Sequence, residues 1–404
     1  MMNPARYWQS KQWQTPVVML MLMTAAMEMS FATWRALINN FAVERASFTG
    51  AEMGILQSIR EIPGFLAFSA VFILLMMREQ TLVLTSLLLL GVGTAITGFF
   101  PTEIGLYCTV LIMSIGFHYY ETMNQSLSLQ WLSKEEAPAA LGKVLAVGSF
   151  AAIAAFGLIS LLWKVLALDY DHIYLGGGGV TILLVLVMWL LFPHFQIKVE
   201  QRKKLVLRKR YWLYYLLTFM AGARRQIFVV FAGFLMVEKF GFSVAAITLL
   251  FLANNVFNML FAAKIGRMIG QWGERRSLIF EYGGLIAVFV AYAFVDNAWI
   301  AAGLYILDHA FFAMRIAMKT YFQKIADPAD FAPTSGVAFS INHIAAVLIP
   351  ASFGLIWLVS PALVFLLGAG MSALSLVLAM LVPENPAEGN ETVLGGPVSP
   401  VPAE

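Results

Sequence analysis

The sequence is poor in cysteine, histidine and charge. Its 404 residues hold one cysteine, Cys108, which excludes an internal disulfide and a cysteine-based zinc site. The five histidines are scattered without a His-x-x-x-His spacing or a His-Glu pair, so we predict no metal site and no cofactor. Charged residues make up 12% of the chain, whereas soluble domains approach a quarter. Together with 60% hydrophobic residues, this excludes an ordinary soluble domain.

Motifs for nucleotide chemistry and covalent catalysis are also missing. The glycines at 176–179 are not followed by Gly-Lys-Ser/Thr, so they do not form a phosphate loop. No nucleophile, base and acid occur in a familiar order, and we predict that the chain is not an enzyme. The basic run at 202–210 is explained by membrane orientation and anionic lipid headgroups, so nucleic acid is not an expected partner.

The apolar residues fall into about twelve stretches, each long enough to cross the ~30 Å hydrocarbon core of a bilayer. The predicted spans are 16–38, 51–76, 81–100, 103–131, 140–164, 173–193, 212–237, 243–264, 276–296, 298–323, 334–358 and 361–382. Residues 1–14 lack a signal-peptide cleavage pattern, so the first span is expected to stay as a membrane helix. The sequence therefore predicts an all-α, multi-pass membrane protein.

The distribution of lysine and arginine predicts the orientation. If the N-terminus is inside, the outer loops hold only Arg45, Lys164 and Lys239, and all other loop bases lie inside. Short loops rich in Lys and Arg stay cytoplasmic, so both termini are predicted inside, in a bacterial inner membrane.

A basic loop after the sixth span divides the chain into two similar halves. We predict a six-helix bundle at 1–194, a cytoplasmic linker at 195–211, a second six-helix bundle at 212–383 and a disordered tail at 384–404. His118 and His309 occupy matching positions in the fourth and tenth spans, and an Ala-Pro pair followed by a glycine comes after each. This pattern is typical of two parallel, pseudo-symmetric six-helix repeats.

The loop Gly266-Arg267-Met268-Ile269-Gly270-Gln271-Trp272-Gly273-Glu274-Arg275-Arg276 is similar to the signature loop of the major facilitator superfamily. Its usual acid is replaced by Gly270, and the counterpart at 76–80 has lost the pattern. The chain resembles this superfamily over residues 15–383. The resemblance implies twelve helices, a small-solute carrier working by alternating access, and a latch formed by Gly266, Arg267, Gly273 and Arg275.

The subfamily is not identified by this resemblance. The fifth span lacks the glycine-proline motif of drug-proton antiporters, and Glu121 stands in the fourth span where those proteins carry an arginine. The sugar-porter signature after the sixth span is also absent.

Polar and charged residues of several spans share the same depth, near the middle of the membrane. A charge at this depth is costly where it faces lipid, so these side chains are expected to face a polar central cavity. The mid-depth residues are Glu28, Arg60, Glu61, His118, Glu121, Arg224, Arg225, Asn254, Asn255, Asn258, Asp308, His309, Arg315, Asn342 and His343.

The chemistry of these groups indicates their roles. The buried bases number six and the acids four, which favours a carboxylate or phosphate as substrate. We expect the anionic group to be held by Arg224, Arg225 and Arg315, with hydrogen bonds from Asn254, Asn255, Asn342 and His309. We expect Glu28 and Glu121 to carry protons, with His118 as a relay. Gating or interbundle pairing is expected for Arg60, Glu61, Asp308 and Lys319.

Several alternatives stay open. Intramembrane charges also pair to fix helix packing, and one member of each adjacent pair, Arg60-Glu61 and Arg224-Arg225, is expected to point away from the cavity. The aromatic and methionine content also fits export of a drug or lipid-like compound, and a non-transporting receptor or scaffold is a further alternative. A solute and membrane lipids are the expected partners of a monomer. Substrate identity, direction and coupling ion are left open.

Overall fold

The computed structural model describes residues 13–48, 50–165, 168–196, 199–242 and 244–394. Over these residues the chain is helical, and its only β-type pairing is the isolated bridge between Ala387 and Asn390. Consecutive helices join end to end into twelve continuous helical segments, which confirms the predicted fold class. Eight described helices are long and apolar enough to cross a membrane by length and composition.

The first half holds six of these segments. Their bounds are α1 (Pro16–Ala46), α2 (Gly50–Phe65) with η2 (Leu66–Ser69) and α3 (Ala70–Ile73), α4 (Glu79–Thr97), α5 (Glu103–Trp131), α6 (Ala137–Val165) and α7 (Tyr170–Leu191).

The second half holds the other six and two short 3₁₀ turns. Their bounds are η3 (Lys209–Tyr211), α8 (Trp212–Gln226) with η4 (Ile227–Ala232) and α9 (Gly233–Glu238), α10 (Val244–Trp272), α11 (Glu274–Phe294), α12 (Ala298–Phe312) with η5 (Ala313–Arg315) and α13 (Ile316–Ile325), η6 (Pro328–Asp330), α14 (Phe331–Val359) and α15 (Pro361–Met380).

Local sequence explains where many of these helices begin. Thr15 and Ser360 accept a hydrogen bond from a backbone N–H of the first turn, and a proline follows each of them at the first helical position. Thr102 caps α5 in the same way. Between α10 and α11 the chain turns at a single residue, Gly273, whose φ of +79° is accessible mainly to glycine.

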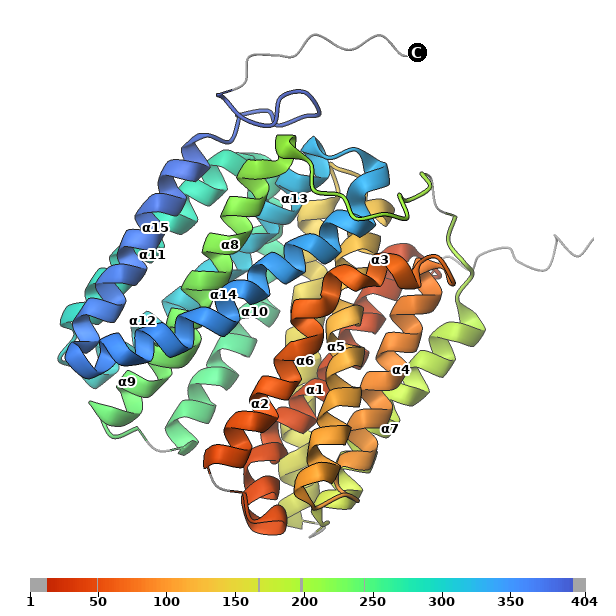
Figure 1. The fold of residues 1–404 in the computed structure, drawn as a ribbon, viewed down its shortest axis with the longest axis vertical. Helices are drawn as coiled ribbons and strands as arrows, with labels where there is room; N and C mark the ends of the chain where they lie inside the picture. Colours follow the sequence, from red (N-terminus) through yellow and green to blue (C-terminus); the bar gives the residue numbers. More distant parts are fainter. Residues whose placement is uncertain (1–12, 49, 166–167, 197–198, 243, 395–404) are drawn as a thin grey trace, which may run out of the picture.

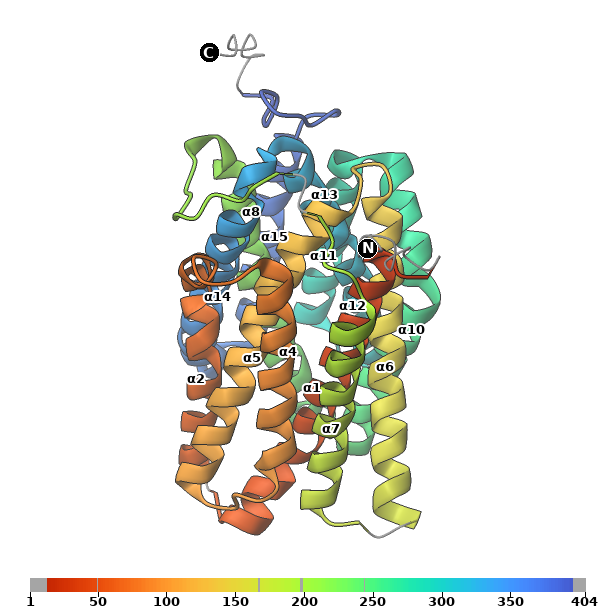
Figure 2. The same cartoon turned by 90° about the vertical axis from the view of Figure 1, so that its right-hand side faces the viewer.

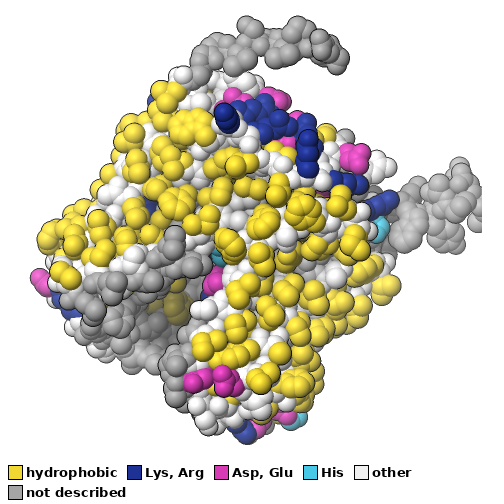
Figure 3. All heavy atoms as spheres, in the orientation of Figure 1, with side chains coloured by type: hydrophobic (Ala, Val, Ile, Leu, Met, Phe, Trp, Pro, Cys, Tyr) yellow, Lys and Arg dark blue, Asp and Glu magenta, His cyan; other side chains and the backbone are white. Residues whose placement is uncertain are grey.

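Figure 1 shows the two halves as separate groups of helices, with α1 to α7 on one side and α8 to α15 on the other, and in Figure 2 the first half lies in front of the second. The start of α1, the linker (residues 195–211) and the end of α15 share one end of the molecule, which we call the linker end. The other end is the opposite end. In Figure 3, Lys and Arg gather at the linker end, while apolar side chains cover the flanks below it.

The contacts between the halves run from the linker end to mid-depth. Gly266 of α10 packs so closely on Pro138 of α6 that a Cβ would overlap the Pro138 carbonyl oxygen. The Gln323 side chain of α13 donates hydrogen bonds of 2.8 Å to the carbonyls of both Leu129 and Leu132, at the end of α5. These contacts close the linker end.

At the opposite end the ion pairs of the described residues stay within one half. Arg45, at the end of α1, bonds to Asp169 at the start of α7 at 2.7 Å, and Lys239 after α9 pairs with Asp296 at 2.6 Å. Figure 1 shows the two groups of helices diverging towards this end. The structure is therefore closed at the linker end, and its halves separate at the opposite end.

The linker is tied to the second half. Asp330, which is fully buried between α13 and α14, accepts hydrogen bonds from Arg202, Arg208 and the Tyr211 hydroxyl. Arg202 also donates to Asp327 at 2.6 Å. Burial raises the pKa of the Asp327 carboxyl, but hydrogen bonds from the Ala329 N–H and from Arg202 outweigh it, so the pKa lies below its ordinary value.

Residues 384–394, which belong to the predicted disordered tail, form contacts in the structure. The Tyr321 hydroxyl donates to the Glu391 carbonyl at 2.6 Å, and Arg210 donates to Glu388 at 2.9 Å. The Val393 N–H donates to the Leu381 carbonyl at 2.9 Å. Residues 384–394 of the predicted tail thus contact the linker and the second half, and residues 395–404 lie outside the described residues.

Candidate functional site

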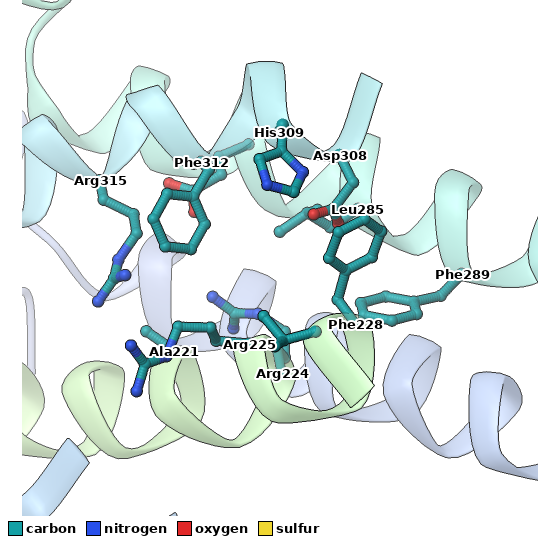
Figure 4. Close-up of a pocket in the computed structure, with 12 residues that line it drawn as sticks. Ala221, Arg224, Arg225, Phe228, Leu285, Phe289, Asp308, His309, Phe312 and Arg315 are labelled. Atoms are coloured by element: carbon teal, nitrogen blue, oxygen red, sulfur yellow. The ribbon is translucent and has the colours of Figure 1, made fainter. Parts of the chain in front are cut away.

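A pocket opens at mid-depth in the second half, between α8, η4, α11, α12 and η5 (Figure 4). Its open volume is about 530 Å³, including solvent at the mouth. The lining consists of Ala221, Arg224, Arg225, Phe228, Val229, Glu281, Leu285, Phe289, Asp308, His309, Phe312 and Arg315. In Figure 4 the labelled side chains of α8 and those of α12 and η5 point towards each other across the pocket.

Two helical irregularities border this pocket. The α-helix of α8 changes to a π-helix directly after Gln226, and α12 changes to a 3₁₀ turn at 313–315, which carries Arg315. Short π and 3₁₀ insertions within a helix frequently occur at functional sites. Here the 3₁₀ turn carries Arg315 itself, and the π-helix begins two residues after Arg225.

Arg224 belongs to a buried network inside the second half. Its side chain is 4% exposed, donates to the Ser375 hydroxyl, and lies 4.4 Å from the centre of the Tyr282 ring. Glu281 and Asp308, at 3% and 5% exposure, interact electrostatically with it. Arg224 therefore balances two acids of its own bundle.

Arg225 faces the first half. It is half-buried and donates a hydrogen bond of 3.2 Å to Asn342 of α14. It also interacts electrostatically with Arg315, and across the interface with Glu61 and Glu121. Of the two adjacent arginines, Arg225 is thus the one directed towards the space between the halves.

The bases of the second half lie opposite acids of the first. Glu121 of α5 interacts electrostatically with Lys319, Arg315 and Arg225, and all four side chains are half-buried. Glu28 of α1 is half-buried too and interacts with Glu121. Partly exposed charges of opposite sign therefore face each other between the bundles at mid-depth, and among the described residues none of them forms an ion pair within 4.0 Å across this interface.

Aromatic rings cover the apolar side of the pocket. The His309 ring lies 5.3 Å from Phe228 and 5.0 Å from Tyr305 by ring centroids, and its Nδ1 lies 3.3 Å from the Tyr305 carbonyl. The Arg315 guanidinium lies 4.6 Å from the centre of the Phe312 ring. The pocket thus combines fixed positive groups with flat apolar walls.

The predicted asparagines lie outside this pocket lining. Asn342 bridges α14 and α8, because its amide donates to the Thr218 carbonyl at 3.3 Å while its oxygen accepts from Arg225. Asn255 donates to the Phe251 carbonyl of its own helix. Asn254 is 3% exposed, and both its amide atoms are without a hydrogen-bond partner among the described residues.

The residues predicted for gating are distributed over two places. Arg60 and Glu61 pair with each other at 2.5 Å on α2, so neither member turns fully away. Glu61 also approaches His118, whose Nε2 lies 4.0 Å from its Oε2. Asp308 lies in the Arg224 network described above.

In the predicted signature loop, Gly266 and Gly273 have structural reasons to be glycine, as described above. Arg267 is exposed and Arg275 half-buried, and neither forms an ion pair within the described part of the chain. The ion pair at this place is formed by Glu274, which binds Lys324 of α13 at 2.8 Å.

Glu281 is not among the residues predicted from the sequence, although it lies inside the predicted span 276–296. An acid within an apolar span is the signal that identifies it. It brings the buried acids to five against the same six bases and reduces the excess of positive charge. Tyr282 and Ser375 have no sequence signal, because uncharged side chains are common in apolar spans.

Comparison with known proteins identifies the family. The profile of the Major Facilitator Superfamily matches residues 15–350, and the chain belongs to this superfamily. It is an integral, multi-pass membrane transporter. No protein of curated function matches it in sequence.

Solved structures with the same fold share little sequence with the chain. A single-residue variant of FucP, a fucose:proton symporter from E. coli, has a TM-score of 0.72 at 14% identity, over 90% of this chain and 97% of that one. A bacterial homologue of the iron transporter ferroportin, outward-facing with soaked iron, has a TM-score of 0.67 at 12% identity, over 90% and 97%. At these identities the likeness shows the fold alone.

Proposed function

We propose that the protein is a proton-coupled secondary transporter of a small solute that carries an anionic group. The observation that carries this proposal is the facing arrangement at mid-depth, with Arg225, Arg315 and Lys319 on one half and Glu121 and Glu28 on the other. These side chains are partly exposed, and Arg225 and Arg315 also line the pocket.

Electrostatic competition couples the proton to the solute. An ionised Glu121 neutralises the facing bases, and a solute carboxylate or phosphate competes with it for them. When Glu121 takes a proton, its charge disappears and the guanidinium groups of Arg225 and Arg315 become available for two parallel hydrogen bonds to the anion. By linkage, the anion then binds more tightly to the protonated carrier, and each favours the binding of the other.

Alternating access follows from the way the halves meet. In the described state the linker end is closed by Gly266 on Pro138 and by the hydrogen bonds of Gln323, while the opposite end is divergent. Rocking of the bundles would break these contacts and form new ones at the opposite end. We propose that the linker end is cytoplasmic in a bacterial inner membrane, with both termini on that side, because exposed Lys203, Lys204 and Lys209 gather there.

A second candidate is export of an amphipathic compound. The pocket walls formed by Phe228, Phe289 and Phe312 would accept an apolar body while an arginine holds a polar end. The FucP neighbour is a symporter by name, which agrees with proton coupling in this fold and does not identify the solute.

A ligand screen by thermal unfolding tests the proposal. A ligand that binds only the folded carrier raises its unfolding temperature by mass action. We expect stabilisation by small organic carboxylates or phosphates, and a loss of this effect in Arg225→Gln. Stabilisation by neutral solutes or lipophilic cations alone would contradict the anion assignment.

Proton coupling is tested separately in sealed vesicles with the ligand found by the screen. We expect Glu121→Gln to exchange the solute across the membrane but to lose accumulation driven by a pH gradient. Glu103→Gln, on an exposed residue at the start of α5, serves as the matched control. Full pH-driven accumulation in both Glu121→Gln and Glu28→Gln would contradict the proposed coupling.

A further inference from the structure

Three side chains of the types that bind metals meet between the two halves. They are Glu61 of α2, His118 of α5 and His343 of α14, and one ligand atom of each lies within 4.8 Å of the others. Both histidines are buried, at 2% and 5% exposure. The group lies outside the pocket lining and joins residues that are far apart in the sequence.

Hydrogen bonds fix the same tautomer in both histidines. His343 Nδ1 lies 2.9 Å from the Phe339 carbonyl, which can only accept, so Nδ1 carries the proton. His118 Nδ1 lies 2.9 Å from both the carbonyl and the hydroxyl of Ser114. That hydroxyl donates its proton to the Arg60 carbonyl, so Nδ1 must again be the donor.

The remaining ring nitrogens therefore present lone pairs to a carboxylate. His343 Nε2 lies 3.6 Å and His118 Nε2 lies 4.0 Å from Glu61 Oε2. The other carboxylate oxygen, Oε1, is held by Arg60. No described residue donates a hydrogen bond to any of these three acceptors, and a cation at their centre would satisfy all of them.

The separations fit a metal ion. For ligands about 2.1 Å from a tetrahedral ion, neighbouring ligand atoms lie about 3.4 Å apart. The distances of 3.6 Å and 4.0 Å to Glu61 exceed this by about 0.2 and 0.6 Å, and all three ligand atoms lie within 4.8 Å of one another, so small side-chain movements would bring them to an ion. A histidine that binds metal through one nitrogen commonly donates its other N–H to a backbone carbonyl, as both do here. Two imidazoles and one carboxylate favour a borderline transition metal such as Zn²⁺ over Mg²⁺ or Ca²⁺.

The surrounding chain holds the rings in this position. A Cβ at Gly64 would lie 2.5 Å from the His343 ring and 2.7 Å from the His118 ring, so only glycine leaves both rings their space. Phe339 stacks on His343 with ring centroids 4.5 Å apart. The positive charges of Arg60 and Arg225 lie nearby and weaken the binding of a divalent ion.

We propose that Glu61, His118 and His343 form a site for one divalent transition-metal ion, with water as the fourth ligand. Because two ligands belong to the first half and one to the second, a bound ion fastens the halves at mid-depth. This role goes beyond solute transport and does not depend on the proposed anion site.

Metal titration of the purified, chelator-treated protein tests the site. We expect one Co²⁺ per chain, seen by its visible absorption, and displacement of Co²⁺ by Zn²⁺. His343→Gln and His118→Gln should each weaken binding at least about tenfold, since loss of even a hydrogen-bond partner of a metal ligand costs that much. His172→Gln and His194→Gln, on exposed histidines outside the site, should bind as the unchanged protein does.

Glu61→Gln keeps the side-chain volume and provides a second test if a histidine variant does not fold. Thermal unfolding with the anion found by the screen shows whether each variant keeps the solute site, so failure of the two proposals can be told apart. Absence of metal binding at neutral pH, or equal affinity in His343→Gln and His172→Gln, would overturn the metal site.

Discussion

Two neighbouring arginines should respond to the same substitution in opposite ways. Arg225 is half-buried and close to the like charges of Arg315 and Arg60, so its removal relieves repulsion as it breaks the bond to Asn342. We expect Arg225→Gln to change the free energy of unfolding by no more than about 1.5 kcal/mol, because relief of this repulsion offsets part of the about 1.5–3 kcal/mol that a hydrogen bond to a charged group contributes.

The same variant should lose solute affinity. A hydrogen bond to a charged partner contributes about 1.5–3 kcal/mol, which corresponds to about tenfold to hundredfold in affinity. Arg225→Lys keeps the charge but loses the planar guanidinium, so we expect its solute affinity to lie between that of the unchanged protein and that of Arg225→Gln.

Arg224→Gln should instead destabilise the fold. It removes the partner of Ser375 and Tyr282 and leaves Glu281 and Asp308 without their shared base. Loss of a buried hydrogen bond to a charged group costs about 1.5–3 kcal/mol, and loss of the Tyr282 contact and of the positive charge near two buried acids adds to this cost.

Thermal unfolding in detergent, with and without the anion found by the screen, measures both quantities on the same samples. If Arg224→Gln lost only affinity and Arg225→Gln lost only stability, the assignment of the two arginines would be wrong. Equal effects of the two substitutions would also refute it.

Three further predictions concern the linker end. Asp330→Ala removes the acceptor of Arg202, Arg208 and Tyr211. Because both arginines are about a third exposed, we expect the free energy of unfolding to fall by only about 1–2 kcal/mol. The linker amides should exchange hydrogen faster, and unchanged exchange would contradict the role of this contact. Because the pKa of Asp327 is lowered, its contribution to stability is complete at neutral pH and is lost as the pH falls below about 4. The linker amides should therefore lose protection from hydrogen exchange only in that acidic range, and loss near pH 6 would argue against this role of Asp327. Gly266→Ala should separate α6 from α10 and favour opening of the linker end, measured as the distance between spin labels on the two halves. Gly179 has open space around it, so Gly179→Ala should leave that distance unchanged. Equal distances in the two variants would show that the close approach at Gly266 does not hold the halves together.

The helical segments could be predicted because length and hydropathy are local properties. The predicted span 103–131 coincides with α5, and the predicted 361–382 differs from α15 by two residues at its end. The π-helix after α8 could not be predicted, because apolar composition does not encode which backbone hydrogen bond forms. The contacts of residues 384–394 with Arg210 and Tyr321 could not be predicted, because a polar composition does not show which groups it will meet.

The site could be predicted as a set of residues at one depth but not as a geometry. Periodicity places Arg224 and Arg225 about 100° apart on the helix, but it does not say which one meets the other bundle. That depends on Ser375 and Tyr282, which are distant in the sequence. His118 and His343 meet for the same reason, since only the packing of α5 against α14 brings their rings within 5.1 Å.

Chemical labelling at mid-depth tests the transport account most directly. Cys108 is exposed and would first be replaced by serine, after which Glu121→Cys places one thiol among Lys319, Arg315 and Arg225. We predict that a membrane-impermeant thiol reagent added on the side of the opposite end labels this cysteine, and that the anion found by the screen slows the labelling. A thiol at 121 that stays unlabelled from either side of the membrane, in a folded protein, would show that no water-filled space separates the halves at this depth.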